Sequence, residues 1–465
     1  MRKLVLIFSI CLAVFSSCQK IKQQEKKTLR IAFNTDPYTI DPRKNSDLYS
    51  STFIFMLYDG LTKTLPSGEI VLQLADRYTV SEDGLTYTFY LKKTKWSDGK
   101  PLTSHDFVYS WESQLDSKFP SPCKYLLYPI KNAEEVATGE VATNSLGIRA
   151  IDDYTLEVIL ARPAPYFLSV TSFCNLYPLP KHIIEKNPFW EMEGKKLPAS
   201  GPFCLKEWNK NREIKVQKNP LYWDAENVGL DEILVSIIAD ENTVLQMFEN
   251  NELDWIGTPL SPLPIEAIPK LQKSKKFNYH PVAGTIFLTY NLHSFPFNNL
   301  HLRAAFSYAL NRLDIVKNIS RQDEIIATRA LPPALMNRQN KIILEDHDLE
   351  LAKENFSEAL SELEITVQDL EEIHLLYQSP NQKNIAQTLQ NQWEKAFGIT
   401  VKIEGYDNKV LLDKLEKRDF DISIYNWLAQ VNDPMNILDR FKFSSNPKNY
   451  SRWEDDEFIR LLDQS

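Results

Sequence analysis

The feature that most constrains the fold is an alternation of strand and helix patterns towards the C-terminus. Apolar runs at 373–378, 399–405 and 420–427 have the length and composition of strands. Two amphipathic helical segments lie between them, the first stopped by Gly398 and the second covering 409–417. Strands that alternate with helices in this way predict a parallel sheet covered by helices, and hence an α/β fold.

A sheet of this kind also predicts where a ligand binds. In open α/β sheets, ligands bind beyond the carboxyl ends of the strands. The segment 426–434 leaves the last predicted strand and is therefore a candidate ligand site. Another amphipathic helix is predicted upstream, with the apolar residues Leu302, Ala305, Phe306, Ala309, Leu310 and Leu313 at helical spacing.

The first half of the chain is rich in short strands and turns. A strand is predicted at 28–34, and a helical pattern at 53–61 ends near a glycine. The runs FCLKEW (203–208) and EIKVQK (213–218) predict a hairpin.

Three consecutive residues, Ser104, His105 and Asp106, have the residue types of a hydrolase triad. A triad needs a base that touches both the nucleophile and the acid. Consecutive helical side chains point about 100° apart and cannot meet in that way. Because Thr103 and Asp106 have the spacing of a capping box, we interpret the run as the start of a helix.

Length and charge narrow the functional class. A chain of 465 residues is too long to fold around a single small core, so two or three domains are expected. The chain has 53 basic and 62 acidic residues, a net charge of −9, which argues against a nucleic-acid binder. The charges are interspersed, as on an ordinary solvated surface.

The N-terminus has the pattern of a targeting segment. Two basic residues precede an apolar run, Leu4 to Phe15, which is too short to span a bilayer. Small residues then precede Cys18, as in a bacterial lipoprotein signal whose cleavage leaves a lipidated cysteine. We expect residues 1–18 to be this signal and 19–27 to be a polar tether. An ordinary signal peptide is the alternative.

The remaining cysteines leave the pairing open. Cys123, Cys174 and Cys204 could form one disulfide with one free thiol, or no disulfide. The cysteines and histidines lack the spacing of a zinc site, so no metal is expected.

Catalytic motifs are absent from the sequence. It contains no HExxH, GxSxG, Walker or GxGxxG motif, and its seven histidines are scattered. We therefore expect neither an enzyme nor a cofactor. An aromatic content of 11% suits a ligand-binding protein and equally suits a packed core.

Seven blocks of the sequence stand out in a fixed order. They are IDPRKN (40–45), YDGLTK (58–63), LTYTFYLKKTKWSDGKPLTSHDFVYSW (85–111), SGPFCLKEW (200–208), KNPLYWD (218–224), LRAAFSYALNRLDIV (302–316) and NWLAQVNDP (426–434). Together these blocks resemble one family, the large periplasmic solute-binding proteins of peptide ABC transporters, bacterial extracellular solute-binding family 5. The resemblance runs from about Thr28 to the C-terminus and favours the oligopeptide-binding branch.

The resemblance implies a two-lobed periplasmic-binding-protein fold of type II, the large peptide-binding class, with an extra domain in the first lobe. The lobes close on an extended peptide about a hinge, and the peptide backbone pairs with the protein like an added strand. The implied parts are lobe I at 28–65 and 186–283, its extra domain at 66–185, and lobe II at 284–465.

Residues that match the family's ligand contacts come from both lobes. Trp427 matches the cleft tryptophan, and Tyr425, Gln430, Asn432 and Asp433 lie in the same block. Core packing is the alternative for the aromatic residues. From other blocks, Leu48 falls on a strand-like peptide contact with Tyr49 beside it, and Tyr128 and Phe287 fall near aromatic contacts.

Two departures from the family pattern concern charge. Peptide binders carry Asp three residues after the tryptophan, for the peptide ammonium, and this chain has Gln430. The oligopeptide branch carries Arg three residues before it, and this chain has Ile424. A cysteine pair of that branch is replaced by Gly284 and Leu428. Asp433 could supply the missing carboxylate if the loop is shifted.

The end of the sequence also differs. Family members continue for several dozen residues beyond SRWEDDEFIRLLDQS and return a strand to the first lobe, so this return segment is expected to be missing.

The sequence thus predicts a monomeric, lipid-anchored, extracytoplasmic protein that binds peptides and delivers them to an ABC permease and ATPase complex. It is expected not to bind nucleic acid. A non-peptide ligand such as a metal chelate or a saccharide, or a truncated paralogue that does not transport, remain alternatives.

Overall fold

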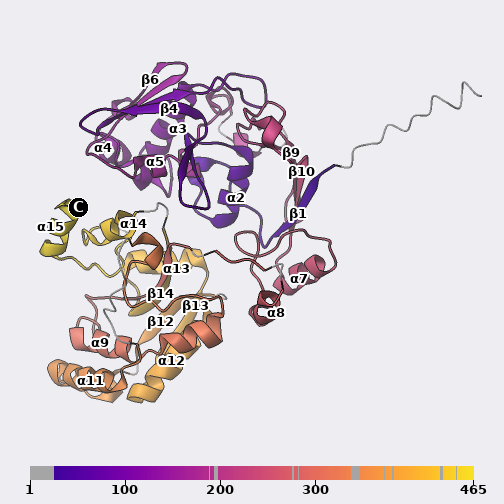
Figure 1. Ribbon diagram of the computed structural model, residues 1–465. Coiled ribbons are helices and arrows are strands. Elements are labelled where there is room, and N and C mark those ends of the chain that lie inside the picture. Colours follow the sequence, from indigo (N-terminus) through magenta and orange to yellow (C-terminus); the bar gives the residue numbers. More distant parts are fainter. Residues whose placement is uncertain are drawn as a thin grey trace, which may run out of the picture.

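Figure 1 shows the structure, a computed structural model, as two main bodies joined by crossing segments. It describes residues 26–187, 189–192, 197–274, 277–280, 282–336, 346–370, 372–379, 382–429, 433–446 and 448–464.

Each body has its own hydrophobic core, which makes the fold two-lobed as predicted. One cluster of buried side chains extends from Ile31 to Leu260 and fills the first lobe. Another extends from Phe297 to Ile424 and fills the second lobe. Because the two cores are separate, each lobe can keep its shape if the lobes move relative to each other.

The sheet of the first lobe joins distant parts of the chain. Its strands, in sheet order, are β1 (Thr28–Phe33), β10 (Glu232–Ile237), β9 (Glu213–Lys218) and β8 (Phe203–Asn209). β1 and β10 are parallel, whereas β8 and β9 form the predicted antiparallel hairpin.

Between β1 and β8 the chain builds another antiparallel sheet. Its strands, in order, are β4 (Ala75–Val80), β5 (Thr86–Leu91), β7 (Thr155–Ile159) and β6 (Ile148–Asp152). A short hairpin of β2 (Thr62–Thr64) and β3 (Ile70–Leu72) precedes it. The helix α3 (Ser104–Leu115) contributes Phe107, Trp111 and Leu115 to the first-lobe core.

The start of α3 confirms the interpretation of the Ser-His-Asp run. The carboxylate of Asp106 accepts the backbone N–H of Thr103 at 2.9 Å and the indole N–H of Trp96 at 3.3 Å. The Ser104 hydroxyl donates to the Asp152 carbonyl, and His105 is exposed. The three side chains therefore do not form a triad.

The second lobe contains the predicted parallel strands. In sheet order the strands are β11 (Gly284–Tyr290), β14 (Ile422–Leu428), β12 (His374–Gln378) and β13 (Lys402–Tyr406). β12 is parallel to both β13 and β14, as the alternation predicted. β11 is an antiparallel edge strand, so the sheet is mixed.

Helices complete the second lobe. They are α9 (Leu300–Tyr308), α11 (Leu349–Leu363), α12 (Lys383–Phe397) and α13 (Asn408–Lys417). α12 buries Leu389, Trp393 and Phe397 and ends at Gly398, which has the left-handed φ of 70° expected of a helix stop.

Two helix predictions are corrected by local capping. The helix predicted from Leu302 to Leu313 breaks, because the Asn311 side chain accepts the N–H of Asp314 at 2.8 Å and starts α10 (Arg312–Asp314). A π-helix, η9 (Ile315–Ser320), follows. The other helix begins at Leu48, five residues before its predicted start, and is α2 (Leu48–Leu57).

The remaining helices are short. They are α4 (Ala133–Thr138), α5 (Phe167–Val170), α6 (Lys181–Ile184), α7 (Glu241–Glu249), α8 (Ile268–Gln272), α14 (Met435–Leu438) and α15 (Asp456–Gln464). In the described part of the chain, none of the helices has both the length and the apolar character of a bilayer span.

The sequence left open whether Cys123, Cys174 and Cys204 form one disulfide or none. In the structure all three are free thiols. Burial raises the pKa of Cys123 to about 11 and that of Cys174 to about 12. Thiols this far from ionisation are unreactive at neutral pH.

Candidate functional site

The strand β14 brings three of the predicted ligand residues together. Trp427 and Tyr425 are two residues apart on β14, so their side chains lie on one face of the sheet. Phe287 on β11 is the register partner of Tyr425. All three contact one apolar cluster, whose buried members are Leu335, Trp427 and Ile437.

Within this cluster Trp427 is almost fully covered. Only 9% of it is exposed, and Leu335 and Ile437 are among its neighbours. The structure therefore places Trp427 in the packing of the second lobe. A contact between its indole and a ligand stays a prediction.

The segment after β14 is only partly described. Gln430 and Asn432 lie outside the described residues. Asp433 begins the next turn, where its carboxylate accepts the backbone N–H of Met435 at 2.8 Å. Its role as a substitute for the missing family carboxylate stays a prediction.

Leu48, which the resemblance implies as a strand-like peptide contact, lies at the start of a helix, and its contact with a ligand stays a prediction. Leu48 is the first residue of α2, because the carboxylate of Asp47 caps the helix by accepting the N–H of Ser50 at 2.8 Å. Leu48 is 45% exposed. Tyr49 packs instead on Phe33, with ring centroids 5.4 Å apart.

Tyr128 lies in the inserted part of the first lobe, directly after η2 (Lys124–Leu127). It is 36% exposed, and its N–H donates to the Tyr125 carbonyl at 3.2 Å. Burial raises the pKa of Tyr128, and the nearby Glu134 carboxylate raises it further.

Titratable side chains of the two lobes lie near each other around α5 and α14. Burial raises the pKa of Tyr166, beside α5, and the carboxylates of Asp439 and Asp433 in the second lobe raise it further. Tyr125 similarly acts on Arg440. Figure 1 shows α14 on the side of the second lobe that faces α5. These segments therefore belong to the surface between the lobes.

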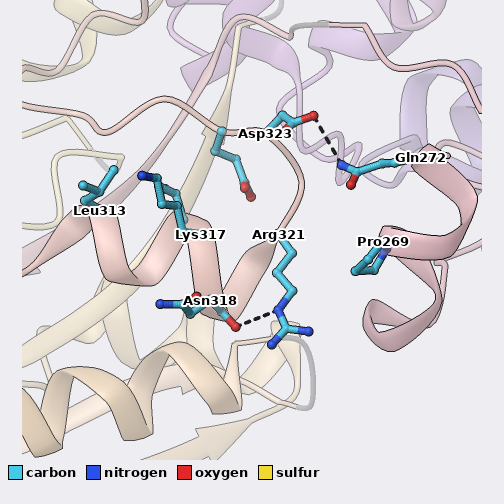
Figure 2. A pocket seen from close by; sticks show the side chains of 9 residues that line it. Pro269, Gln272, Leu313, Lys317, Asn318, Arg321 and Asp323 are labelled. Atoms are coloured by element: carbon cyan, nitrogen blue, oxygen red, sulfur yellow. Dashed lines mark hydrogen bonds between the residues drawn. The ribbon is translucent and has the colours of Figure 1, made fainter.

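A separate contact between the lobes lies beside α8. The side-chain amide of Gln272 donates to the Asp323 carboxylate at 3.3 Å, as Figure 2 shows. The contact borders a cavity of about 490 Å³. The cavity is lined by Pro269, Gln272, Leu313, Val316, Lys317, Asn318, Arg321, Asp323 and Glu324.

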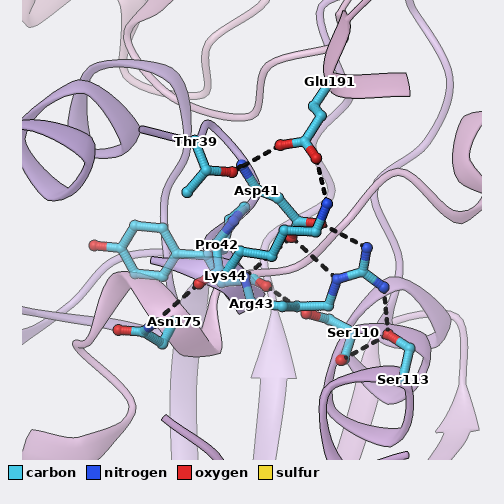
Figure 3. Close-up of polar contacts among 10 residues, drawn as sticks. Thr39, Asp41, Pro42, Arg43, Lys44, Ser110, Ser113, Asn175 and Glu191 are labelled. Atoms are coloured by element: carbon cyan, nitrogen blue, oxygen red, sulfur yellow. Dashed lines mark hydrogen bonds and ion pairs between the residues drawn. The ribbon is translucent and has the colours of Figure 1, made fainter. Parts of the chain in front are cut away.

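A buried ion pair fixes the loop that leads into α2. Arg43 forms a bidentate pair with Asp41, at 3.0 and 2.7 Å, and also donates to the Ser113 hydroxyl at 2.9 Å. Glu191 binds the neighbouring Thr39 and Lys44 side chains, as Figure 3 shows. The loop is thereby held against α3, just before the Asp47 cap at which α2 begins.

Sequence reasoning missed a cation that packs on Tyr425 of β14. Arg440 lies in η12 (Asp439–Phe441), and its guanidinium carbon is 4.9 Å from the ring centroid of Tyr425 and 5.2 Å from that of Tyr450. Its Nε donates to the Lys448 carbonyl at 2.7 Å. A single arginine in the run MNILDRFKF gives too weak a pattern to be found from sequence.

Metal chemistry is not indicated by the part of the chain that the structure describes. No group of three His, Cys, Asp or Glu side chains is placed there to hold a metal ion. The chemistry available between the lobes is hydrogen bonding, aromatic contact and charge pairing.

Comparisons with known proteins agree with the two-lobed fold. The family model of bacterial extracellular solute-binding proteins, family 5, matches residues 69–449. The Bacillus subtilis oligopeptide-binding protein OppA is 35% identical over 478 residues, covering 99% of this chain and 87% of that protein. The probable deoxycholate-binding periplasmic protein YgiS of Escherichia coli is 28% identical, and the match covers 95% of this chain and 82% of that protein.

A solved structure gives the same result. Haemophilus influenzae OppA in complex with RPPGFSPFR superposes with a TM-score of 0.81 at 26% identity, covering 95% of this chain and 87% of that one. The family model spans well over half of this sequence. The chain therefore belongs to the bacterial extracellular solute-binding proteins, family 5.

Proposed function

We propose that the chain is the substrate-binding protein of an ABC importer, which binds oligopeptides between its lobes and delivers them to the permease and ATPase complex. It acts by binding and performs no catalysis. The observation that supports this most is the similarity to Bacillus subtilis OppA over nearly the whole chain.

The fold suits this task physically. An extended peptide can pair its main chain with the protein, which makes binding largely independent of peptide sequence. Two lobes with separate cores can close on the peptide as rigid bodies. The peptide then selects the closed state, which the permease would recognise.

The proposed ligand contacts come from both lobes. The second lobe supplies Tyr425, Trp427, Gln430, Asn432, Asp433 and Phe287. The first lobe supplies Leu48, Tyr49 and Tyr128. The proposed division of the chain keeps lobe I at 28–65 and 186–283, the inserted domain at 66–185 and lobe II at 284–465.

We also propose that the protein is extracytoplasmic, monomeric and held to a membrane by lipid on Cys18. The support for export and for the anchor is the sequence pattern of the N-terminus. Metabolic labelling with a fatty acid tests it. The wild-type chain should incorporate label and Cys18→Ala should not, and equal labelling of both would refute the anchor.

Identification of bound ligands tests the peptide function. The full-length protein, purified without denaturation, should release peptides that mass spectrometry can sequence. Added alanine peptides of two to six residues should raise the unfolding temperature, because a ligand at 100 times its Kd adds about 2.7 kcal/mol to stability. The absence of copurified peptide, together with no shift at millimolar concentration, would refute the proposal.

A non-peptide ligand is the second candidate. The observation in its favour is the similarity to YgiS, together with Gln430 at the position where peptide binders carry Asp. Deoxycholate in the same unfolding assay separates the two candidates. A shift with deoxycholate and none with any peptide would favour the second.

A further inference from the structure

Arg440 is a half-buried cation for which the described residues supply no counter-charge. Its guanidinium lies over Tyr425, Tyr450 and Phe441, at 4.9, 5.2 and 5.6 Å from the ring centroids. None of the ion pairs in the described part of the chain includes it. In contrast, the buried Arg43 has the carboxylate of Asp41 as its partner.

The hydrogen bonds of Arg440 also leave donors unused. Nε donates to the Lys448 carbonyl, and the Tyr425 hydroxyl is a second partner. A guanidinium has five N–H groups, and the described residues provide these two acceptors for them. Burial lowers the pKa of Arg440, and the groups that oppose this are tyrosines rather than carboxylates. Removing a cation from water without a counter-charge is unfavourable.

Arg440 lies near residues of the first lobe. Tyr125, which acts on Arg440, belongs to the inserted part of the first lobe. Asp433 and Asp439, on the same segment as Arg440, act on Tyr166 of that lobe. The η12 segment continues from α14, which faces the first lobe in Figure 1.

We propose that Arg440 determines specificity by pairing with a carboxylate of the ligand. This inference rests on the proposed function and names its ligand class, namely peptides with a free C-terminal carboxylate or an acidic side chain. A guanidinium and a carboxylate form a planar two-point pair, which an ammonium group cannot reproduce.

Matched peptides test the inference by isothermal titration calorimetry on the full-length protein. Alanine peptides of two to six residues are compared as free acids and as C-terminal amides. Amidated five-residue alanine peptides that carry one Glu, or one Gln at the same position, test whether an acidic side chain supplies the carboxylate. We expect the wild type to bind one carboxylate form at least tenfold more tightly than its neutral counterpart. The form that shows the preference identifies the source of the carboxylate.

Substitutions assign the preference to Arg440. In Arg440→Met, the affinity for the carboxylate form and the affinity for its neutral counterpart should differ by less than twofold. In Arg440→Lys, which retains the charge but cannot form the planar pair, the ratio of these two affinities should be intermediate. Arg303→Met is the matched control. Arg303 is also half-buried and donates to a backbone carbonyl, that of Phe297, at 2.7 Å. It lies in α9, which packs on α11, so its variant should keep the wild-type ratio.

The outcomes separate the inference from the proposed function. Equal binding of acid and amide forms by the wild type, or an unchanged ratio in Arg440→Met, overturns the inference while peptide binding stands. Failure of every peptide form to bind overturns the proposed function as well. If Arg440→Met does not fold, the ratio in Arg440→Lys decides, and an unchanged ratio there overturns the inference.

Discussion

Asp59, a buried carboxylate that follows α2, offers a direct test of the electrostatics of the first lobe. Only 2% of Asp59 is exposed. Its Oδ2 accepts hydrogen bonds from the Tyr222 hydroxyl and the Trp223 indole, each at 2.9 Å. Asparagine has an oxygen that can accept both bonds, so Asp59→Asn removes the charge and keeps the contacts.

The expected magnitude comes from the pKa. Burial raises the pKa of Asp59 from 3.8 to about 6, although Trp223, Tyr222, Lys63 and Lys92 act to lower it. A shift of about 2 units corresponds to about 3 kcal/mol. The folded state binds the proton more tightly than the unfolded state, so stability falls as pH rises from about 4 to about 6 and is level above that range. The Asp59→Asn variant has no such loss, because its amide does not titrate.

Denaturant unfolding of both proteins between pH 4 and pH 8 measures the difference. Asp59→Asn should gain about 3 kcal/mol relative to the wild type between pH 4 and pH 7, because other titrations cancel in the difference. Asp83→Asn is the control of opposite sign. Hydrogen bonds, first from Ser81, lower the pKa of Asp83 below its ordinary value. This variant should therefore be less stable than the wild type by a constant amount at neutral pH, and the difference should disappear only below about pH 4, to which its series is extended. A pH-independent difference for Asp59→Asn would refute the reasoning.

Two further variants test packing near the proposed site. Arg43→Met leaves the fully buried Asp41 carboxylate without its partner and should cost about 3–5 kcal/mol in urea unfolding; a cost below about 1 kcal/mol would show that the pair contributes little. In Gly284→Ala, the new Cβ would lie 2.5 Å from Leu428 Cδ2 and 2.9 Å from the Trp427 carbonyl. It should cost about 1–3 kcal/mol by forcing β11 from β14, and an unchanged unfolding midpoint would contradict this.

Local patterns predicted the second lobe well. The strands β12, β13 and β14 and the helices between them follow from periods of 2 and 3.6 residues, and Gly398 marks a helix end by its left-handed conformation. The sequence did not predict that the helix ends before α10, because the helical spacing of apolar residues continues across this point. A new helix starts there because the Asn311 side chain caps it.

The site was less predictable than the fold. Leu48 and Tyr49 lie on a helix because Asp47 caps it, a signal present in the sequence that the predicted helix start at residue 53 did not use. Tyr125 comes near enough to Arg440 to influence its charge only after both lobes have folded. No local pattern can report a contact between residues so distant along the chain.

The parallel pairing of β1 with β10 has a consequence for biosynthesis. The backbone N–H of Lys27, just before β1, bonds to the Asp231 carboxylate 204 residues away. At roughly 5–20 residues per second, a ribosome releases β1 about 10–40 seconds before its partner exists. Until β10 has been made, β1 offers an unpaired edge to any holdase that meets it.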